Sequence, residues 1–159
     1  LLSFSRPADI KREKFDLLEM LEETLELVSF QAKKQKVGIR REFAAGPLFL
    51  VGDKSQIKQV FLNLCLNSLQ AMLNGGELKL EARWAAPHHA FVAMADSGEG
   101  IAEDNLDRIF DPFFTTKKGG TGLGLSICYG IIKSHGGEIE VQSQAGRGTT
   151  VVVKIPTNA

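Results

Sequence analysis

The chain has 159 residues, of which 43% are hydrophobic and 24% are charged, so its composition is that of an ordinary folded domain and not of a disordered chain. No apolar run reaches the ~18 to 20 residues that cross a bilayer. Because 19 basic residues balance 19 acidic ones, the charge also argues against a nucleic-acid binder that acts through a basic field. The two cysteines, Cys65 and Cys128, lack the spacing of a disulfide framework or a zinc site, and we expect two buried thiols.

Hydrophobic periodicity and turn residues predict the elements of the first half. We expect residues 1–10 to be the end of a preceding element, since Pro7 stops any helix there, and residues 11–159 to form one domain. In chain order, the predicted elements are a strand at 13–17, a helix from 17 to about 36, strands at 37–43 and 48–51 joined by a turn, and a helix that follows Asp53 as its N-cap and ends near Leu73.

The second half is predicted to consist mainly of hairpin strands. Between Glu77 and Trp84, apolar residues alternate with charged ones, as in a sheet with one dry and one wet face. The other predicted elements are a strand at 90–95, a short helix at 103–109, a helix at 121–135 and a hairpin of strands at 137–143 and 149–155. The fold class is therefore α+β, a two-layer sandwich in which a mixed, mostly antiparallel sheet is covered on one face by about three helices.

Two common nucleotide-binding motifs are absent from the sequence. The string G-x-x-x-x-G-K-[ST] does not occur, and the third glycine of G-x-G-x-x-G would fall on Leu125 or Glu103. Neither a Walker A loop nor a Rossmann fingerprint is therefore expected.

Two amides and one carboxylate stand out instead. Asn63 and Asn67 share one face of a predicted helix, where they are either a buried hydrogen-bonded pair or, through their amide oxygens, part of a Mg²⁺ site. Asp96 follows a predicted strand and precedes Gly98 and Gly100. Its carboxylate could accept a hydrogen bond from a ligand amino group, or it could simply close a turn with its own backbone.

A segment rich in phenylalanine precedes a segment rich in glycine. Phe110, Phe113 and Phe114 are expected to anchor a loop with a polar tip, or else a plain connection. The glycines from Gly119 to Gly124 open a predicted helix, where backbone N–H groups and the positive end of the helix dipole could receive a phosphate.

Together these motifs, in this order, are far more specific than any one of them. N-x-x-x-N, D-x-G-x-G, F-x-P-F-F and G-T-G-L-G-L, followed by Gly146-x-Gly148-Thr149-Thr150, resemble the ATP-binding catalytic domain of two-component sensor histidine kinases. That family belongs to a wider group with DNA gyrase, a heat-shock chaperone and a mismatch-repair ATPase. The resemblance covers about residues 11–157 and implies a Bergerat-type ATP-binding fold, with residues 1–10 as the tail of the family's dimerization and phosphoacceptor helix.

The resemblance also implies roles for individual residues. Asn67 would bind Mg²⁺, Asp96 would take the amino group of adenine, and Thr149 would support the base. Asn63 and Lys117 would take part in catalysis, and either Lys117 or Lys118 would reach the terminal phosphates. The remaining ATP-binding residues implied in this way are Gly98, Gly100, Ile101, Phe114, Thr116, Gly120, Thr121, Gly122, Leu123, Gly124 and Leu125.

The residue at position 63 bears on whether ATP is hydrolysed or its phosphoryl group is transferred to another side chain. By the resemblance, ATP-hydrolysing members carry a glutamate where this chain has Asn63, and an amide is a poor general base. We therefore expect phosphoryl transfer to a histidine. His88, His89 and His135 do not lie in an acceptor-like context, and His135, at a predicted helix end, is expected to be cationic or to cap the helix.

The acceptor histidine is accordingly expected on a preceding dimerization domain, with relay to an aspartate of a response regulator. The resemblance implies a homodimeric parent protein and a cytoplasmic catalytic part, and leaves membrane anchoring of the parent open. Three alternatives remain: an ATP-hydrolysing clamp, a serine kinase of the anti-sigma type, and a nucleotide-sensing module without catalysis.

Overall fold

The computed structural model describes residues 11–115 and 124–157, which form a sheet with helices on one of its faces. The helices are α1 (Leu17–Lys34), α2 (Lys54–Gln70), α3 (Glu103–Leu106) and α4 (Gly124–Ser134). The strands are β1 (Glu13–Asp16), β2 (Val37–Phe43), β3 (Phe49–Gly52), β4 (Gly76–Ala85), β5 (His89–Asp96), β6 (Glu138–Gln144) and β7 (Gly148–Pro156).

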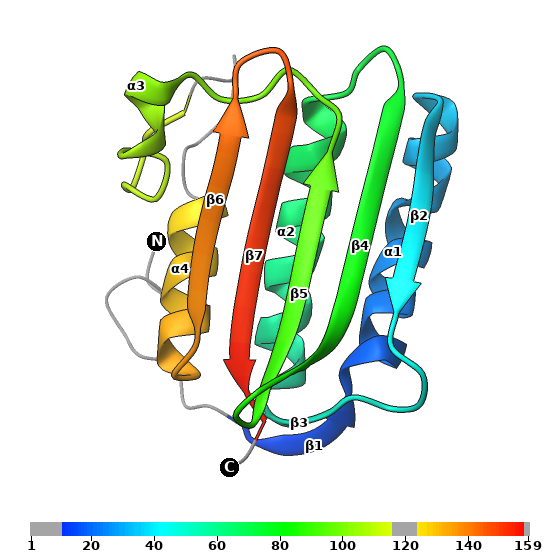
Figure 1. The fold of residues 1–159 in the computed structure, drawn as a ribbon, viewed down its shortest axis with the longest axis vertical. Helices are drawn as coiled ribbons and strands as arrows, with labels where there is room; N and C mark the ends of the chain where they lie inside the picture. Colours follow the sequence, from blue (N-terminus) through cyan, green and yellow to red (C-terminus); the bar gives the residue numbers. More distant parts are fainter. Residues whose placement is uncertain (1–10, 116–123, 158–159) are drawn as a thin grey trace.

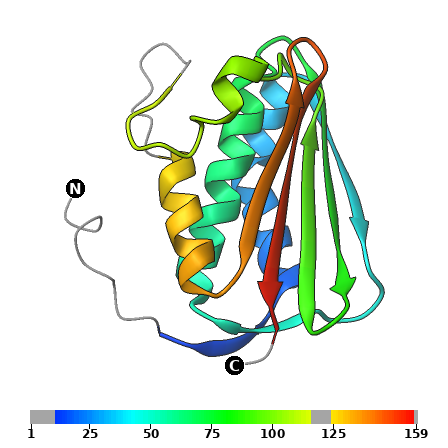
Figure 2. The same ribbon diagram turned by 60° about the vertical axis from the view of Figure 1, so that its left-hand side comes forward.

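The main sheet has five strands in the order β2-β4-β5-β7-β6 (Figure 1). Only the β2–β4 pair is parallel, and the other three pairs are antiparallel. Helices α1, α2 and α4 lie side by side on one face of this sheet, and the other face carries no helix of the described part (Figure 2). The predicted two-layer α+β sandwich with a mixed, mostly antiparallel sheet is thus confirmed.

Aspartate side chains start the two longest helices. Asp53 is the N-cap of α2, as predicted, and its carboxylate accepts the backbone N–H of Gln56 at 3.1 Å. Asp16 caps α1 in the same way through the N–H of Leu18 at 3.0 Å. The same carboxylate oxygen also accepts the N–H of Leu48 at 3.0 Å, so that this cap ties the start of α1 to the segment before β3.

The first strands pair differently from the simple hairpin that their spacing suggested. Strand β3 does not return along β2 but pairs with β1 in a separate two-stranded sheet, where Phe15 lies opposite Leu50. Both of these side chains are buried, and their burial favours this pairing. Helix α3 is also shorter than expected and ends at Leu106.

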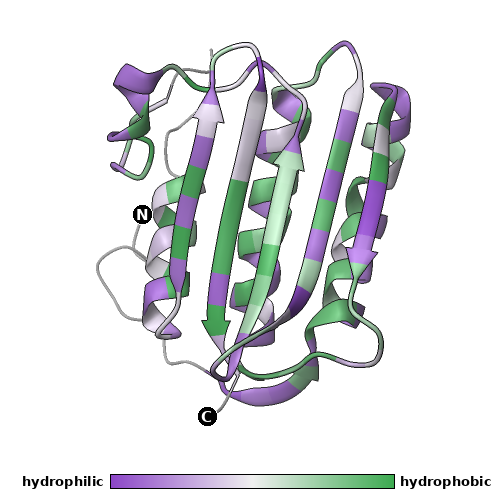
Figure 3. Cartoon of the chain, viewed as in Figure 1, coloured by the Kyte–Doolittle hydropathy of each residue, from purple (hydrophilic) through white to green (hydrophobic). Residues whose placement is uncertain are grey.

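The core lies between the helices and the inner face of the sheet. On β4, Leu78, Leu80 and Ala82 are fully buried, and the residues between them are polar, which gives the alternating bands along this strand in Figure 3. The expected buried face of this strand is therefore confirmed from Leu78 to Ala82. Trp84, on the same face, is 48% exposed because it is the second-last residue of the strand, next to the turn into β5.

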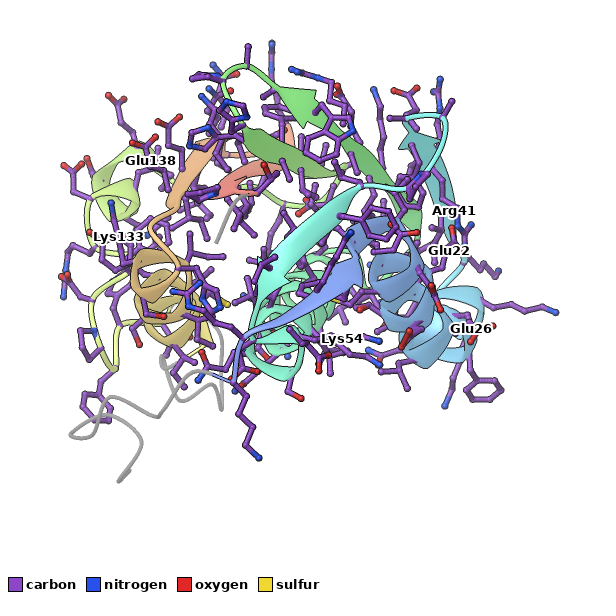
Figure 4. The ribbon with its side chains drawn as sticks, turned by 90° about the horizontal axis from the view of Figure 1, so that it is seen from below. Glu22, Glu26, Arg41, Lys54, Lys133 and Glu138 are labelled. Atoms are coloured by element: carbon purple, nitrogen blue, oxygen red, sulfur yellow. The ribbon has the colours of Figure 1, made fainter. Side chains whose placement is uncertain are left out.

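An ion pair joins the edge strand to the first helix. Arg41 of β2 lies 2.7 Å from a carboxylate oxygen of Glu22 in α1, and the two side chains point toward each other in Figure 4. Both are partly exposed, so the pair contributes little to stability.

Both cysteines are buried in the core as free thiols, as expected. Burial raises the pKa of Cys65 and of Cys128 to about 12, so both side chains are uncharged at neutral pH. Among the described helices, none is both long and apolar enough to span a lipid bilayer.

Candidate functional site

A pocket of about 320 Å³ lies between α2, the start of α4, and the inner face of β6 and β7. The loop after β5 and the segment at 109–115 close its remaining sides. This volume is at the lower end of the range of small-molecule sites. The expected site residues that line the pocket are Asn63, Asn67, Gly100, Ile101, Phe114, Gly124, Leu125 and Thr149.

Asn63 and Asn67 lie one turn apart on the face of α2 that borders the pocket. Both are only partly buried, which favours the site interpretation over a pair sealed in the core. The side chain of Asn63 also hydrogen-bonds with the thiol of Cys128 in α4. One member of the amide pair is thus oriented by the neighbouring helix.

Asp96 is the last residue of β5 and lies at the edge of the pocket rather than among its lining residues. Its Oδ1 atom accepts the N–H of Gly98 at 2.9 Å, so the turn that was considered as an alternative is present. Across the sheet Asp96 is paired with Thr149 of β7. Residues directly opposite in an antiparallel pair project to the same face, which places the carboxylate beside the pocket-lining Thr149.

The two glycines after Asp96 allow close packing of backbone on backbone. A Cβ atom on Gly98 would lie 2.6 Å from the carbonyl oxygen of Ala71, at the end of α2. On Gly100, which has a φ of +73°, it would overlap the carbonyl group of Gln144 at the end of β6. Gly100 borders the pocket, whereas Gly98 does not line it.

The three phenylalanines have different environments. The Phe110 ring packs against that of Tyr129 in α4, with 5.5 Å between their centroids. Phe114 lines the pocket and lies 4.6 Å below the guanidinium group of Arg108. Phe113, which was expected to be a third anchor, is instead 68% exposed and has a positive φ of 68°.

Part of the expected site falls outside the described residues. These positions are Thr116, Lys117, Gly120, Thr121, Gly122 and Leu123. The described chain resumes at Gly124, and both Gly124 and Leu125 at the start of α4 border the pocket. The positive end of this helix therefore faces the pocket.

Charged groups are scarce around the pocket. Glu99 is the only ionisable side chain among the lining residues that the structure describes. The described residues also include no cluster of three or more His, Cys, Asp or Glu side chains that could hold a metal. Asn63 and Asn67 on α2 add amide oxygens to the pocket lining. They fit Mg²⁺, which retains several waters and shares substrate phosphate oxygens.

Sequence reasoning missed Ser143 of β6. Its hydroxyl lies 2.7 Å from the backbone nitrogen of Ile101 and 2.8 Å from the hydroxyl of Thr149. Strands β6 and β7 pair Ser143 with Thr149 directly. The predicted hairpin could have revealed this neighbour, because its register determines which residue lies opposite Thr149.

Comparison with known proteins gives consistent results. Residues 52–159 match the family described as histidine kinase-, DNA gyrase B-, and HSP90-like ATPase. The sensor histidine kinase ZraS of Escherichia coli K12 is 38% identical over 99% of the chain, which covers 34% of ZraS. Sporulation kinase C of Bacillus subtilis is 35% identical over 98% of the chain, which covers 36% of that kinase. The chain thus spans about a third of the length of the curated relatives that it matches.

Solved structures share the fold over nearly the whole chain. The catalytic domain of the histidine kinase ThkA is 34% identical and superposes with a TM-score of 0.84, covering 92% of this chain and 96% of that domain. ThkA in complex with the response regulator TrrA is 30% identical with a TM-score of 0.85, covering 99% of this chain and 45% of ThkA. Full-length ShkA in complex with AMPPNP is 25% identical with a TM-score of 0.86, covering 97% of this chain and 33% of ShkA.

Proposed function

This chain belongs to the histidine kinase-, DNA gyrase B-, and HSP90-like ATPase family, as a catalytic domain of the histidine kinase type, and we propose that it supplies the ATP-dependent step of a longer sensor histidine kinase. The observation that carries the proposal is the convergence on one pocket of Asn63 and Asn67, Thr149 and the start of α4. Residues 1–10 are proposed to end the preceding dimerization helix, and residues 11–159 to be the catalytic domain.

The base of ATP is proposed to lie at the end of the pocket where β5 ends and β7 begins. Asp96 would accept a hydrogen bond from the adenine amino group, Thr149 would support the base, and Gly100 and Ile101 would lie along it. ShkA, which shares this fold, is in complex with AMPPNP, and this supports a nucleotide as the ligand.

The phosphates are proposed to lie between α2 and the start of α4. Gly124 and Leu125 would face them with backbone N–H groups, and the preceding glycines, Gly120 and Gly122, would continue this cradle. Phe114, Thr116, Thr121 and Leu123 are proposed to border the nucleotide, and Lys117 to reach the terminal phosphate.

Asn67 is proposed to hold Mg²⁺ through its amide oxygen, together with phosphate oxygens and water. The ion, when bound, neutralises charge on the phosphates during transfer. The remaining requirement of phosphoryl transfer is alignment, and the rigid α2 and α4 helices provide it.

The acceptor is proposed to be a histidine of a dimerization domain in the same protein. Its ring nitrogen would form a bond to the γ-phosphorus, while the bond between that phosphorus and the bridging oxygen of ADP breaks. Asn63 cannot remove a proton from water at neutral pH, which favours this transfer over hydrolysis. Relay to a response regulator is proposed in turn, and the complex of ThkA with TrrA supports a partner of this kind. The parent is proposed to be a homodimer.

The test compares this chain with a longer form of the protein that includes the dimerization domain, each incubated with γ-labelled ATP and Mg²⁺. We expect the chain alone to bind ATP without rapid hydrolysis, and acid-labile, base-stable label to appear only in the longer form. Asn67→Ala in the longer form should abolish the label, whereas Gln59→Ala, at an exposed position of α2 outside the pocket, should retain it. Fast release of phosphate by the chain alone, or normal labelling of Asn67→Ala, would contradict the proposal.

A further inference from the structure

The hydroxyl of Ser143 lies at the centre of a small polar cluster behind the pocket. It is within hydrogen-bonding distance of three groups: the backbone N–H of Ile101 at 2.7 Å, the carbonyl oxygen of Gly148 at 2.9 Å, and the hydroxyl of Thr149 at 2.8 Å. Ser143 is not itself a pocket-lining residue, whereas Ile101 and Thr149 are. It therefore touches the site only through these neighbours.

The positions of the protons in this cluster follow from the chemistry of its members. The three bonds can form at the same time in one way only. A carbonyl oxygen can only accept, so in that arrangement Ser143 donates its single proton to Gly148. A backbone N–H can only donate, so one lone pair of Ser143 receives Ile101. The remaining lone pair then accepts from Thr149, so in the arrangement that satisfies all three contacts the hydroxyl of Thr149 is the donor.

This assignment of donors and acceptors determines which groups Thr149 offers to a ligand in the pocket. Its only proton is directed toward Ser143, away from any ligand, and the oxygen offers the pocket lone pairs alone. Asp96, its partner across the strands, carries a carboxylate that is likewise an acceptor. The base end of the pocket is thus bordered by two acceptors, which suits an amino group on the base and disfavours a carbonyl oxygen.

The backbone around Ser143 holds this arrangement in place. The N–H of Gly146, in the β6–β7 turn, donates to the carbonyl oxygen of Glu99 at 2.7 Å. A Cβ atom on Gly148 would overlap the carbonyl group of Asp96, so the turn and the loop after β5 pack without side chains between them. This packing holds Ile101, Gly148 and Thr149 within reach of the Ser143 hydroxyl.

We propose that Ser143 is a positioning residue that determines base specificity, because it fixes the Thr149 hydroxyl as an acceptor toward the base. The inference rests on the proposed nucleotide function and extends it to the choice between a 6-amino and a 6-oxo purine. Without Ser143, the Thr149 hydroxyl is able to turn its proton into the pocket and to donate to a carbonyl oxygen.

The test measures the affinities of the chain for ATP and for inosine triphosphate, whose base carries an oxygen in place of the 6-amino group. We expect the wild type to prefer ATP, and Ser143→Ala to reduce the ratio of the two affinities by roughly 3- to 10-fold, which is the range of one hydrogen bond. Ser143→Thr, which retains a hydroxyl, should restore the ratio. Thr150→Ala removes a hydroxyl from the neighbouring position of β7 and should leave the ratio unchanged.

Two further measurements separate positioning from a merely structural role. If the role of Ser143 were only structural, Ser143→Ala would lower the melting temperature and weaken the binding of both nucleotides equally. The ratio of the two affinities would then not change. In a Thr149→Val background, Ser143→Ala should have no additional effect on the ratio, because its action passes through the missing hydroxyl. If Ser143→Ala does not fold, Ser143→Cys, which replaces a strong acceptor by a weak one, should give the same reduction.

The outcomes also distinguish this inference from the proposed function. A wild type that binds neither nucleotide would overturn both. A wild type that prefers ATP, combined with an unchanged ratio in the folded Ser143 variants, would overturn the role of Ser143 alone. An additional loss in the Thr149→Val background would show that Ser143 acts by another route and would equally overturn it.

Discussion

The carboxylate of Asp96 takes part in a turn and also lies at the edge of the pocket. One of its oxygens closes the turn to Gly98, and the side chain lies beside Thr149 at the edge of the pocket. The turn fixes the orientation of the carboxylate before any ligand arrives. In the proposed site, this orientation would reduce the entropy that binding must lose.

Asp96→Asn tests this placement. An asparagine retains a carbonyl oxygen for the Gly98 N–H, so the turn and the stability of the fold should be preserved. Its amide nitrogen would replace the other oxygen and face the amino group of adenine as a second donor. We expect ATP affinity measured by calorimetry to fall about 5- to 150-fold, equivalent to roughly 1 to 3 kcal/mol. An unchanged affinity would remove Asp96 from the site.

At the scale of elements, the two helices that border the pocket are joined at their far ends by one buried histidine. The Nε2 atom of His135, directly after α4, accepts the N–H of Asp53 at 3.0 Å, at the start of α2. Its Nδ1 atom bonds to the carbonyl oxygen of Ile131 at 2.8 Å. Since Nε2 is an acceptor and Nδ1 the donor, the ring is neutral and caps the helix end. The expected capping role is therefore confirmed, and a cationic role is not.

His135→Ala should destabilise the protein by about 1 to 3 kcal/mol, because it leaves the buried N–H of Asp53 without its acceptor. Urea unfolding measures the difference in the free energy of unfolding. Lys133→Ala is the matched control at an exposed position of the same helix, and it should change the stability by less than about 0.5 kcal/mol. Equal effects of the two substitutions would show that the link between α4 and α2 contributes nothing.

The whole molecule is a two-layer sandwich, and β5 ends where β7 begins (Figure 1). The pocket is lined by residues of α2, α4, β6, β7 and the loop after β5, which come from distant parts of the sequence. A ligand in that cavity contacts both layers at once. Because such a ligand binds only the folded state, its binding should stabilise the entire fold against unfolding.

Thermal unfolding of the chain in the presence of Mg²⁺ and ATP tests this coupling. At a ligand concentration of 100 times Kd, the stabilisation is about 2.7 kcal/mol. For a chain of this size, that corresponds to a rise in Tm of roughly 5 to 11 °C. Asp96→Asn at the same ATP concentration should show a smaller rise. A Tm that does not depend on ATP would contradict a site between the layers.

The sequence by itself determined the elements and their order. Alternation from Leu78 to Ala82 gave the strand and its buried face, and Asp53 marked the start of α2 correctly. The spacing of Asn63 and Asn67 predicted that they share one helical face, and both line the pocket. These features are local, because a strand or helix of known period places its own side chains without reference to the rest of the chain.

Only the tertiary structure decided which segments meet. The pairing of β3 with β1 rather than β2, the exposure of Phe113, and the hydrogen bond between Ile101 and Ser143 could not be obtained from periodicity. Each depends on contacts between residues that are far apart in the sequence or on the register of two strands. Such contacts are selected by the burial and hydrogen bonding of the complete fold, and these energies do not exist until the layers have packed.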